Sequence, residues 1–146
     1  MSNNPPTYYV YTDGSCYPNP GIGAWAYVII DEKDTEYKHS GYVEDTTSNR
    51  MEVTAIINAL EHIETPSKIV ICSDSLYAIN LTTYKSNINK DLRIQLFELM
   101  NKHTVTFKWV KGHSGDYYND MVDDMAYRQL HKAYAILGKT GLSKLT

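Results

Sequence analysis

Five acidic residues lie close to the ends of elements that the sequence predicts. Asp13 follows the first predicted strand, Glu52 lies in the first turn of the first long helix, and Asp74 follows the fourth strand. Asp123 and Asp124 lie in the first turns of the last helix. In open α/β sheets, functional groups gather at strand ends and helix starts, and clustered carboxylates repel unless a cation bridges them. The pattern predicts a site for Mg²⁺ or Mn²⁺, as in two-metal phosphodiester hydrolysis.

Each acid also has a simpler explanation. Asp13 precedes a glycine, and this pair is common in turns. Glu52 stands three residues after Asn49 and could complete a capping box. The pair Asp74-Ser75 could cap the next helix, and the acids of the last helix could complement its dipole. Only the combination of all four positions favours a metal site.

His113 is a candidate proton carrier. A lone histidine is more often structural, but this one stands in the run Gly112-His113-Ser114-Gly115, whose glycines favour mobility over packing. An imidazole in a mobile loop beside a metal site could shuttle protons or assist product release.

The elements that must position these residues follow from the periodicity of apolar residues. Three strands joined by short polar turns precede alternating helices and strands, which indicates an α/β fold with a mixed sheet. The expected strands cover 8–12, 24–30, 36–43, 68–72 and 104–110; the expected helices cover 49–64, a segment after 74–75, 91–103, and a segment from 119 into the 130s.

Composition bounds the class of protein. The 146 residues are 42% hydrophobic and 21% charged, which suits one globular domain over 7–146 after a disordered lead over 1–6. No segment has the roughly 18 consecutive apolar residues of a membrane helix, and the N-terminus lacks the features of a secretory signal. Two cysteines are too few for a disulfide framework, so we expect a cytoplasmic protein without membrane contact.

The net charge of −3 argues mildly against a nucleic-acid partner. If four carboxylates hold metal ions, however, the remaining acids and bases nearly balance. Net charge therefore does not exclude a polyanionic substrate.

Motifs spread over about residues 8–130 together resemble those of the type 1 ribonuclease H family. They are Thr12-Asp13-Gly14-Ser15-Cys16 with Asn19-Pro20-Gly21, Asn49-Arg50-Met51-Glu52, Ser73-Asp74-Ser75-Leu76-Tyr77, and Trp109-Val110-Lys111-Gly112-His113-Ser114-Gly115 with Asn119 and Asp123. The resemblance implies the ribonuclease H-like fold, a five-stranded mixed sheet with three antiparallel strands and two parallel ones, flanked by helices.

The same resemblance implies endonucleolytic hydrolysis of the RNA strand of RNA/DNA hybrids, with 5′-phosphate and 3′-hydroxyl products. Two Mg²⁺ ions, or Mn²⁺, would be held by Asp13, Glu52, Asp74 and Asp123. Asp123 is preferred over Asp124 because it follows His113 by ten residues. His113 would assist proton transfer or product departure, and Glu52 would lie near the 2′-hydroxyl that distinguishes RNA from DNA. A monomer is expected.

The resemblance also implies substrate contacts. Asn19 and Asn49 would face the minor groove of the hybrid, while Thr47 and Asn89 would hold a phosphate of the DNA strand. For Thr47 and Asn89, helix capping is the alternative explanation. The full set of expected contact residues is Gly14, Ser15, Asn19, Thr47, Asn49, Asn89 and Asn119.

Departures from the family pattern predict a lower affinity for the substrate. Ser48 stands where the family often has Asn, and Leu76 where it often has Gln. Between Tyr77 and Asn89 there is no room for the basic protrusion of some members, and Lys85 is the only basic residue there. Affinity is therefore expected to be more sensitive to salt unless the basic tail from Arg128 onward compensates.

Two other functions stay open at this point. A related nuclease could act on DNA or on structured nucleic acid, and a non-catalytic domain could bind hybrids without cutting them. Retention of the acidic residues counts against the second alternative, because clustered charge is costly to keep.

Overall fold

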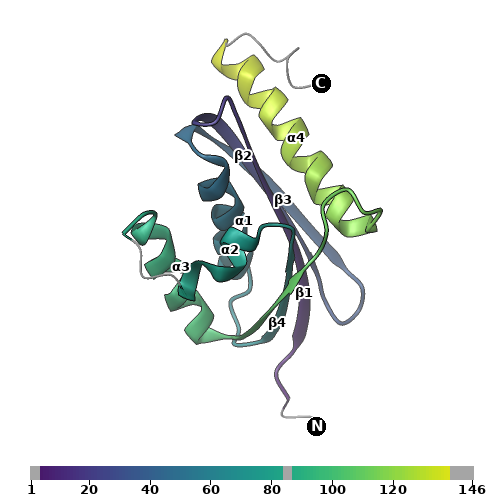
Figure 1. Cartoon of the computed structure of the whole chain (residues 1–146). Helices are drawn as coiled ribbons and strands as arrows, with labels where there is room; N and C mark the ends of the chain where they lie inside the picture. Colours follow the sequence, from purple (N-terminus) through teal and green to yellow (C-terminus); the bar gives the residue numbers. More distant parts are fainter. Residues whose placement is uncertain (1–3, 84–86, 139–146) are drawn as a thin grey trace.

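The computed structural model describes residues 4–83 and 87–138 (Figure 1). Its elements follow the predicted order. They are β1 (Thr7–Tyr17), β2 (Gly21–Ile30), β3 (Glu36–Thr46), α1 (Ser48–His62), β4 (Lys68–Ser73), α2 (Leu76–Asn80), the 3-10 helix η1 (Leu81–Thr83), α3 (Lys90–Lys102), β5 (Thr104–Trp109) and α4 (Tyr117–Leu137).

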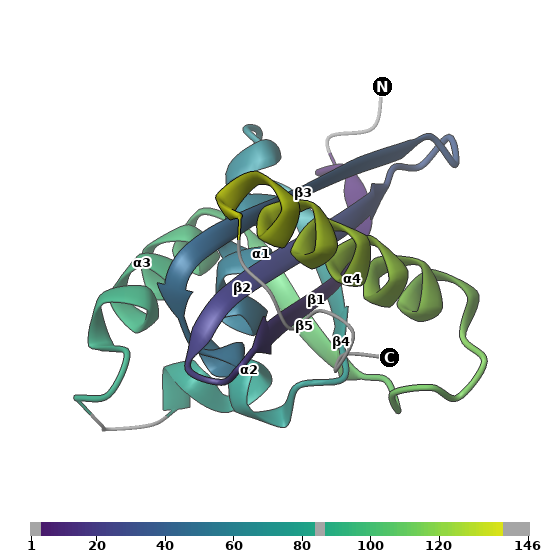
Figure 2. The ribbon, with the colours of Figure 1, turned by 90° about the horizontal axis from the view of Figure 1, so that it is seen from above.

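The five strands form one mixed sheet in the order β3-β2-β1-β4-β5. β1, β2 and β3 pair antiparallel, whereas β4 pairs parallel with β1 and β5 pairs parallel with β4. This confirms the expected fold. Helices α1 and α3 lie on one face of the sheet, and α4 crosses the other (Figure 2).

β2 is buried on both faces, which explains its nearly continuous apolar sequence. Trp25, Tyr27 and Ile29 point to the core beneath α1. The alternate residues Ala26 and Val28 point to the core beneath α4. Because successive side chains of a strand face opposite ways, this one strand anchors both helical layers.

The apolar stripe predicted on the first long helix is the buried face of α1. Met51, Val53, Ile56, Ile57, Leu60 and Ile63 are all buried. Spacing of three and four residues puts such side chains on one face of a helix. This packing fixes the direction in which the first turn of α1 presents its other residues.

β1 corrects the expectation of a turn at Asp13-Gly14, because the strand continues to Tyr17. The physical reason is that pairing with β2 continues as far as Tyr17 opposite Ile22, and Gly14 allows the strand to pass close to α1. A Cβ on Gly14 would lie 2.3 Å from the backbone nitrogen of Glu52. The glycine therefore marks the point where a strand and a helix backbone meet, and the turn follows at residues 18–20.

The parallel register of β1 and β4 brings two of the predicted acids, Asp13 and Asp74, together. Tyr11 is opposite Cys72, the last residue pair of this ladder. Asp13 and Asp74 each follow two residues later, so they leave the paired region at the same edge. Asp13 and Asp74 therefore lie side by side.

Some predictions fall on parts of the chain that are not described. Residues 1–3 of the expected lead, Lys85, and the tail beyond residue 138 lie outside the described residues. Residues 4–6 have no regular structure, and the Pro6 carbonyl accepts a hydrogen bond of 2.8 Å from the Lys68 N–H. No helix in the described part of the chain is long and apolar enough to cross a membrane.

His103, at the junction of α3 and β5, yields a prediction about stability. It is buried, and its Nδ1 accepts a 3.1 Å hydrogen bond from the Ser67 N–H. Burial lowers the pKa of His103 from its usual value. Its contribution to stability is therefore present above about pH 6.5 and is lost as the pH falls through the folded-state pKa.

We expect the wild type to lose up to about 1 kcal/mol more stability than His103→Gln between pH 7.5 and 5.5. Urea denaturation of both proteins at the two pH values measures this double difference. Equal losses in both proteins would show that His103 is not held neutral by the fold.

Candidate active site

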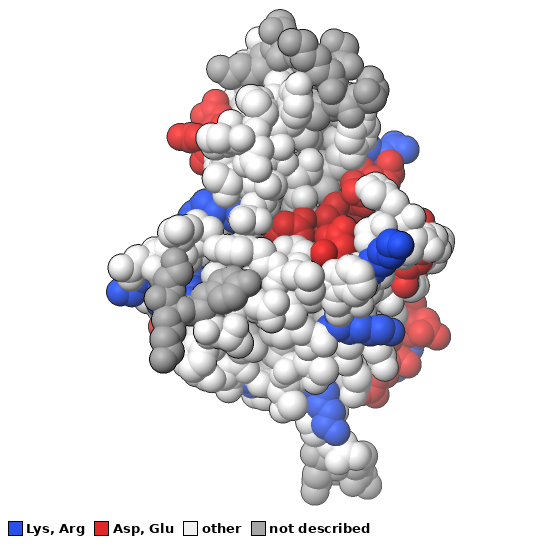
Figure 3. Space-filling view, viewed as in Figure 1, with Lys and Arg blue, Asp and Glu red and all other residues white. Residues whose placement is uncertain are grey.

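Three carboxylates converge in a cleft at the edge where β1 and β4 part. Asp13, Glu52 and Asp74 each offer an oxygen, and these oxygens lie within 4.8 Å of one another. The cleft has a volume of about 480 Å³. Its lining residues are Asp13, Gly14, Ser15, Glu52, Asp74, His113, Asp123, Asp124 and Tyr127. Figure 3 shows acidic side chains gathered in a hollow at the centre of this face.

Asp13 is almost fully buried, and its neighbours in the cleft are acids. Burial, followed by the charge of Glu52, raises the pKa of Asp13, and the carboxylates of Asp74 and Asp123 add to the shift. Burial is also the largest cause of the raised pKa of Glu52. Both effects oppose the charged form, so the cluster is electrostatically costly unless positive charge enters it.

Glu52 does not serve as a capping residue. Thr47 caps α1, since its hydroxyl accepts from the Arg50 N–H at 3.2 Å. Glu52 instead reaches across to β1, where its Oε1 accepts a 2.6 Å hydrogen bond from the Gly14 N–H. Its buried Oε2 has no hydrogen-bond partner among the described residues. An unpaired carboxylate oxygen facing two further carboxylates fits a hard divalent cation.

Asp74 is held by the last residue of β5 and by the loop that follows this strand. Its backbone carbonyl accepts a 3.1 Å hydrogen bond from the indole N–H of Trp109. A Cβ on Gly112 would lie 3.0 Å from Asp74 Oδ2, so the loop backbone packs directly against the carboxylate. Capping of α2 falls to Ser75, whose hydroxyl accepts from the Ala78 N–H at 3.1 Å. The carboxylate of Asp74 is left for the cleft.

His113 and Asp123 line the outer part of the cleft. The backbone of His113 is left-handed, with φ of 55°, and its side chain is 85% exposed. Its Nδ1 lies 3.9 Å from Asp123 Oδ2. Asp124 also lines the cleft, but its carboxylate accepts from the Arg128 Nε–H at 2.7 Å. Asp124 is therefore engaged by Arg128, whereas the Asp123 carboxylate lies beside His113.

The expected substrate-contact residues differ in where they lie: most are at the cleft or on the surface, and one is buried. Gly14 and Ser15 line the cleft, and Asn49 is exposed at the start of α1. Asn19 is tied to Ser48, donating from Nδ2 to the hydroxyl at 2.8 Å and accepting from the Ser48 N–H at 3.2 Å. Asn119, in contrast, is 3% exposed and does not line the cleft, so the structure places it in the interior.

Thr47 and Asn89 differ in how they relate to helix capping. Thr47 caps α1, as the alternative explanation held. Asn89 occupies the N-cap position of α3 without any side-chain capping bond, so capping is the wrong explanation for it.

Sequence reasoning missed two aromatic residues of the site. Trp109 was counted only as part of a strand motif, yet its indole N–H supports Asp74. Tyr127 lines the cleft one helical turn after Asp123, and its ring centroid lies 4.4 Å from that of His131. The spacing of four residues on the last helix was the signal available for Tyr127.

Sequence comparisons identify close resemblances over nearly the whole chain. The profile of the RNase H family matches residues 5–131. A ribonuclease H of Thermoanaerobacter sp. (strain X514) is 38% identical over 148 residues, covering 90% of this chain and 95% of the relative. A ribonuclease H of Chlorobium luteolum is 40% identical over 139 residues, covering 84% of this chain and 94% of the relative.

Solved structures show the same fold at lower identity. LC9-RNase H1, a type 1 RNase H with the type 2 active-site motif, superposes with a TM-score of 0.77 at 21% identity, covering 90% of this chain and 75% of that one. LC11-RNase H1 in complex with RNA/DNA hybrid gives 0.72 at 23% identity, covering 86% and 98%.

The charge of the cluster yields a prediction about stability without metal. In EDTA, Asp13→Asn removes a group that folding must either keep charged among neighbouring carboxylates or protonate, because burial and those carboxylates raise its pKa. It is expected to raise the free energy of unfolding by about 1–3 kcal/mol at pH 7.5, measured by urea denaturation. Asp120→Asn is the control, since this exposed acid should contribute at most about 0.5 kcal/mol through the helix dipole. Destabilisation by Asp13→Asn would contradict the repulsion argument.

The contact between Gly112 and Asp74 yields a second prediction. Gly112→Ala adds a Cβ 3.0 Å from Asp74 Oδ2 and should displace this carboxylate. We expect affinity for Mn²⁺, measured by calorimetry, to fall about 10-fold, as for other residues that orient metal ligands. Ser114→Ala in the same loop is the control and should bind Mn²⁺ as the wild type does. Unchanged affinity in Gly112→Ala would show that the loop does not position Asp74.

Proposed function

Because this chain belongs to the RNase H family, and is therefore a ribonuclease H, we propose that it hydrolyses the RNA strand of RNA/DNA hybrids by a two-metal mechanism. The products would carry 5′-phosphate and 3′-hydroxyl ends. The observation that carries the proposal is the convergence of three carboxylates within 4.8 Å in an open cleft that Asp123 also lines. LC11-RNase H1, which shares the fold, binds an RNA/DNA hybrid, and this supports the same substrate here.

Asp13, Glu52, Asp74 and Asp123 would hold two divalent cations, Mg²⁺ or Mn²⁺. When bound, such ions supply a water nucleophile at neutral pH and stabilise the charge of the leaving oxygen. The protein contributes a rigid acidic frame, because the ligands come from β1, α1, the end of β4 and α4. The unpaired Glu52 Oε2 and the raised pKa values of Asp13 and Glu52 support this assignment.

His113 is assigned to proton transfer and product departure. Its imidazole is exposed, lies 3.9 Å from Asp123, and stands on a loop residue with left-handed backbone. It can therefore exchange protons with solvent while remaining next to the acidic cluster.

Selection for RNA is assigned to Glu52 and to the start of α1. Glu52 would lie near the 2′-hydroxyl, the group that DNA lacks. The Asn19–Ser48 pair and the exposed Asn49 would face the minor groove of the hybrid. Thr47 and Asn89 would hold a phosphate of the DNA strand.

A cleavage assay tests the proposal. A 5′-labelled RNA strand is annealed to DNA, annealed to RNA, or left single, and is incubated with Mg²⁺, Mn²⁺ or EDTA. We expect metal-dependent cutting of the hybrid alone. Asp74→Asn should reduce it by at least about 100-fold, because a metal ligand loses its charge.

Asp120→Asn serves as the matched control for that assay. It removes one exposed acid of α4 outside the cleft, so cleavage should continue at the wild-type rate. Cutting of a labelled duplex DNA under the same conditions would point to another nuclease activity of the same architecture. Tight binding of the hybrid without turnover in either metal would show that the chain binds hybrids and does not cleave them.

A further inference from the structure

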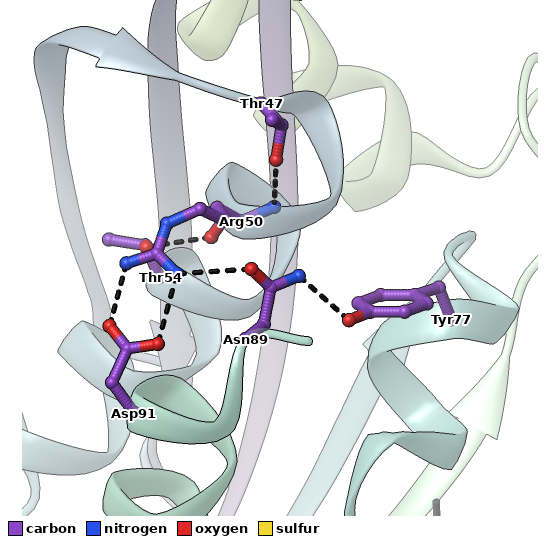
Figure 4. A network of polar contacts seen from close by, with 6 residues as sticks. All are labelled: Thr47, Arg50, Thr54, Tyr77, Asn89 and Asp91. Carbon is purple, nitrogen blue, oxygen red and sulfur yellow. Dashed lines mark hydrogen bonds and ion pairs between the residues drawn. The ribbon is translucent and has the colours of Figure 1, made fainter. Parts of the chain in front are cut away.

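Asn89 is held at both ends of its side-chain amide, although it stands at a helix N-cap position. Its Oδ1 accepts a 3.0 Å hydrogen bond from Arg50 Nη1. Its Nδ2 donates to the hydroxyl of Tyr77 at 2.8 Å. The backbone is left-handed, with φ of 57°, and the side chain does not cap α3. Figure 4 shows this network joining the starts of α1 and α3 to α2.

Arg50 is itself held by a bidentate ion pair with Asp91. Its Nη1 and Nη2 donate to the two carboxylate oxygens of Asp91 at 3.0 and 2.8 Å. Arg50 lowers the pKa of Asp91 to about 2, so this carboxylate stays charged at neutral pH. The pair spans 41 positions of sequence and connects the first turn of α1 with the first turn of α3.

Asn89 does not cap its helix, and its amide contacts two other helices instead. A side-chain cap from Asn at the N-cap position contributes about 1 kcal/mol, and Asn89 forgoes it. The ion pair within the network is substantially exposed, and exposed pairs contribute at most about 1 kcal/mol. What distinguishes the network from a simple cap is the orientation that it imposes on the Asn89 amide.

The chemistry of arginine determines that orientation. A guanidinium only donates hydrogen bonds, so the amide of Asn89 must turn its oxygen towards Arg50. One hydrogen of Nδ2 goes to Tyr77, and the other remains available. The Thr47 hydroxyl already accepts from the Arg50 N–H, so its own hydrogen is free to donate. Both remaining groups are donors, which is what a phosphate oxygen requires.

We propose that Arg50, Asp91 and Tyr77 are positioning residues that orient the Asn89 amide for a phosphate of the hybrid's DNA strand. The inference rests on the proposed function for the identity of the ligand. Asp91 neutralises Arg50 and engages both of its η nitrogens, so we assign Arg50 the role of orienting Asn89.

Asp91→Asn is the discriminating variant. It removes a negative charge, so electrostatics alone predicts tighter binding of a polyanion. Loss of the two-pronged support for Arg50 predicts weaker binding instead. Glu61→Gln is the matched control, because the Glu61 Oε1 accepts from Gln95 Nε2 at 3.0 Å and also joins α1 to α3. It removes the same charge without touching Asn89.

Binding is measured by fluorescence anisotropy with a labelled RNA/DNA hybrid and Mg²⁺. Arg50→Gln, Asp91→Asn and Glu61→Gln are each placed in the Asp74→Asn background, so that cleavage does not interfere. Wild-type cleavage is assayed separately, and its failure would count against the proposed function alone. We expect Arg50→Gln and Asp91→Asn to weaken binding about 5- to 10-fold, as for one or two lost hydrogen bonds, and Glu61→Gln to leave it unchanged.

A second readout separates positioning from a general structural role. A single neutral methylphosphonate is moved along the DNA strand of the probe. The parent protein should lose affinity at one position, and Arg50→Gln and Asp91→Asn should no longer respond there. Equal or tighter binding by Asp91→Asn, or a retained response to the methylphosphonate in both variants, would overturn the proposal.

Discussion

Three carboxylates whose oxygens lie within 4.8 Å of one another in a single cleft are the constraint on which the rest of this structure depends. Like charges repel strongly where water is excluded, so only a rigid backbone holds them together without a cation. Pairing of β1 with β4 and contact of Gly14 with α1 supply that rigidity. The apolar layers on the two faces of β2 offset the electrostatic cost. A cation in the cleft would be attracted by the same carboxylates, so the cluster would favour binding of the metal.

The first turn of α1 carries residues of both the acidic cluster and the expected phosphate contact. Glu52 points inward to the Gly14 N–H, while Thr47 and Arg50 face the start of α3. Helical geometry separates these directions. Arg50 and Glu52 are two residues apart and lie on different sides of the helix, whereas Thr47 and Arg50 are three apart and share a side. Burial of the apolar stripe of α1 therefore orients both Glu52, the expected metal ligand, and Thr47, the expected phosphate contact. Both residues are placed relative to the sheet by this one packing interaction.

Charge also shapes how this protein would recognise a nucleic acid. The cleft is acidic, the net charge is −3, and the positive charge of Arg50 is matched by Asp91. Long-range attraction of a polyanion is therefore weak, and oriented hydrogen-bond donors at helix starts carry more of the recognition. On the proposed function, affinity depends on amide and hydroxyl geometry more than on the number of cations.

The sequence by itself determined the order of elements and the buried face of α1, because apolar periodicity and turn residues are local signals. It also pointed to Asp13, Glu52, Asp74 and Asp123, which the structure brings to one cleft. It did not reveal that β1 continues past Asp13, that Asn119 is buried, or that Trp109 supports Asp74. Nor did it show that Asn89 leaves its helix uncapped to bind Arg50, 39 positions away. The tertiary structure decided those outcomes. Each depends on contacts between residues far apart in the sequence, and the local periodicity of apolar residues does not encode such contacts.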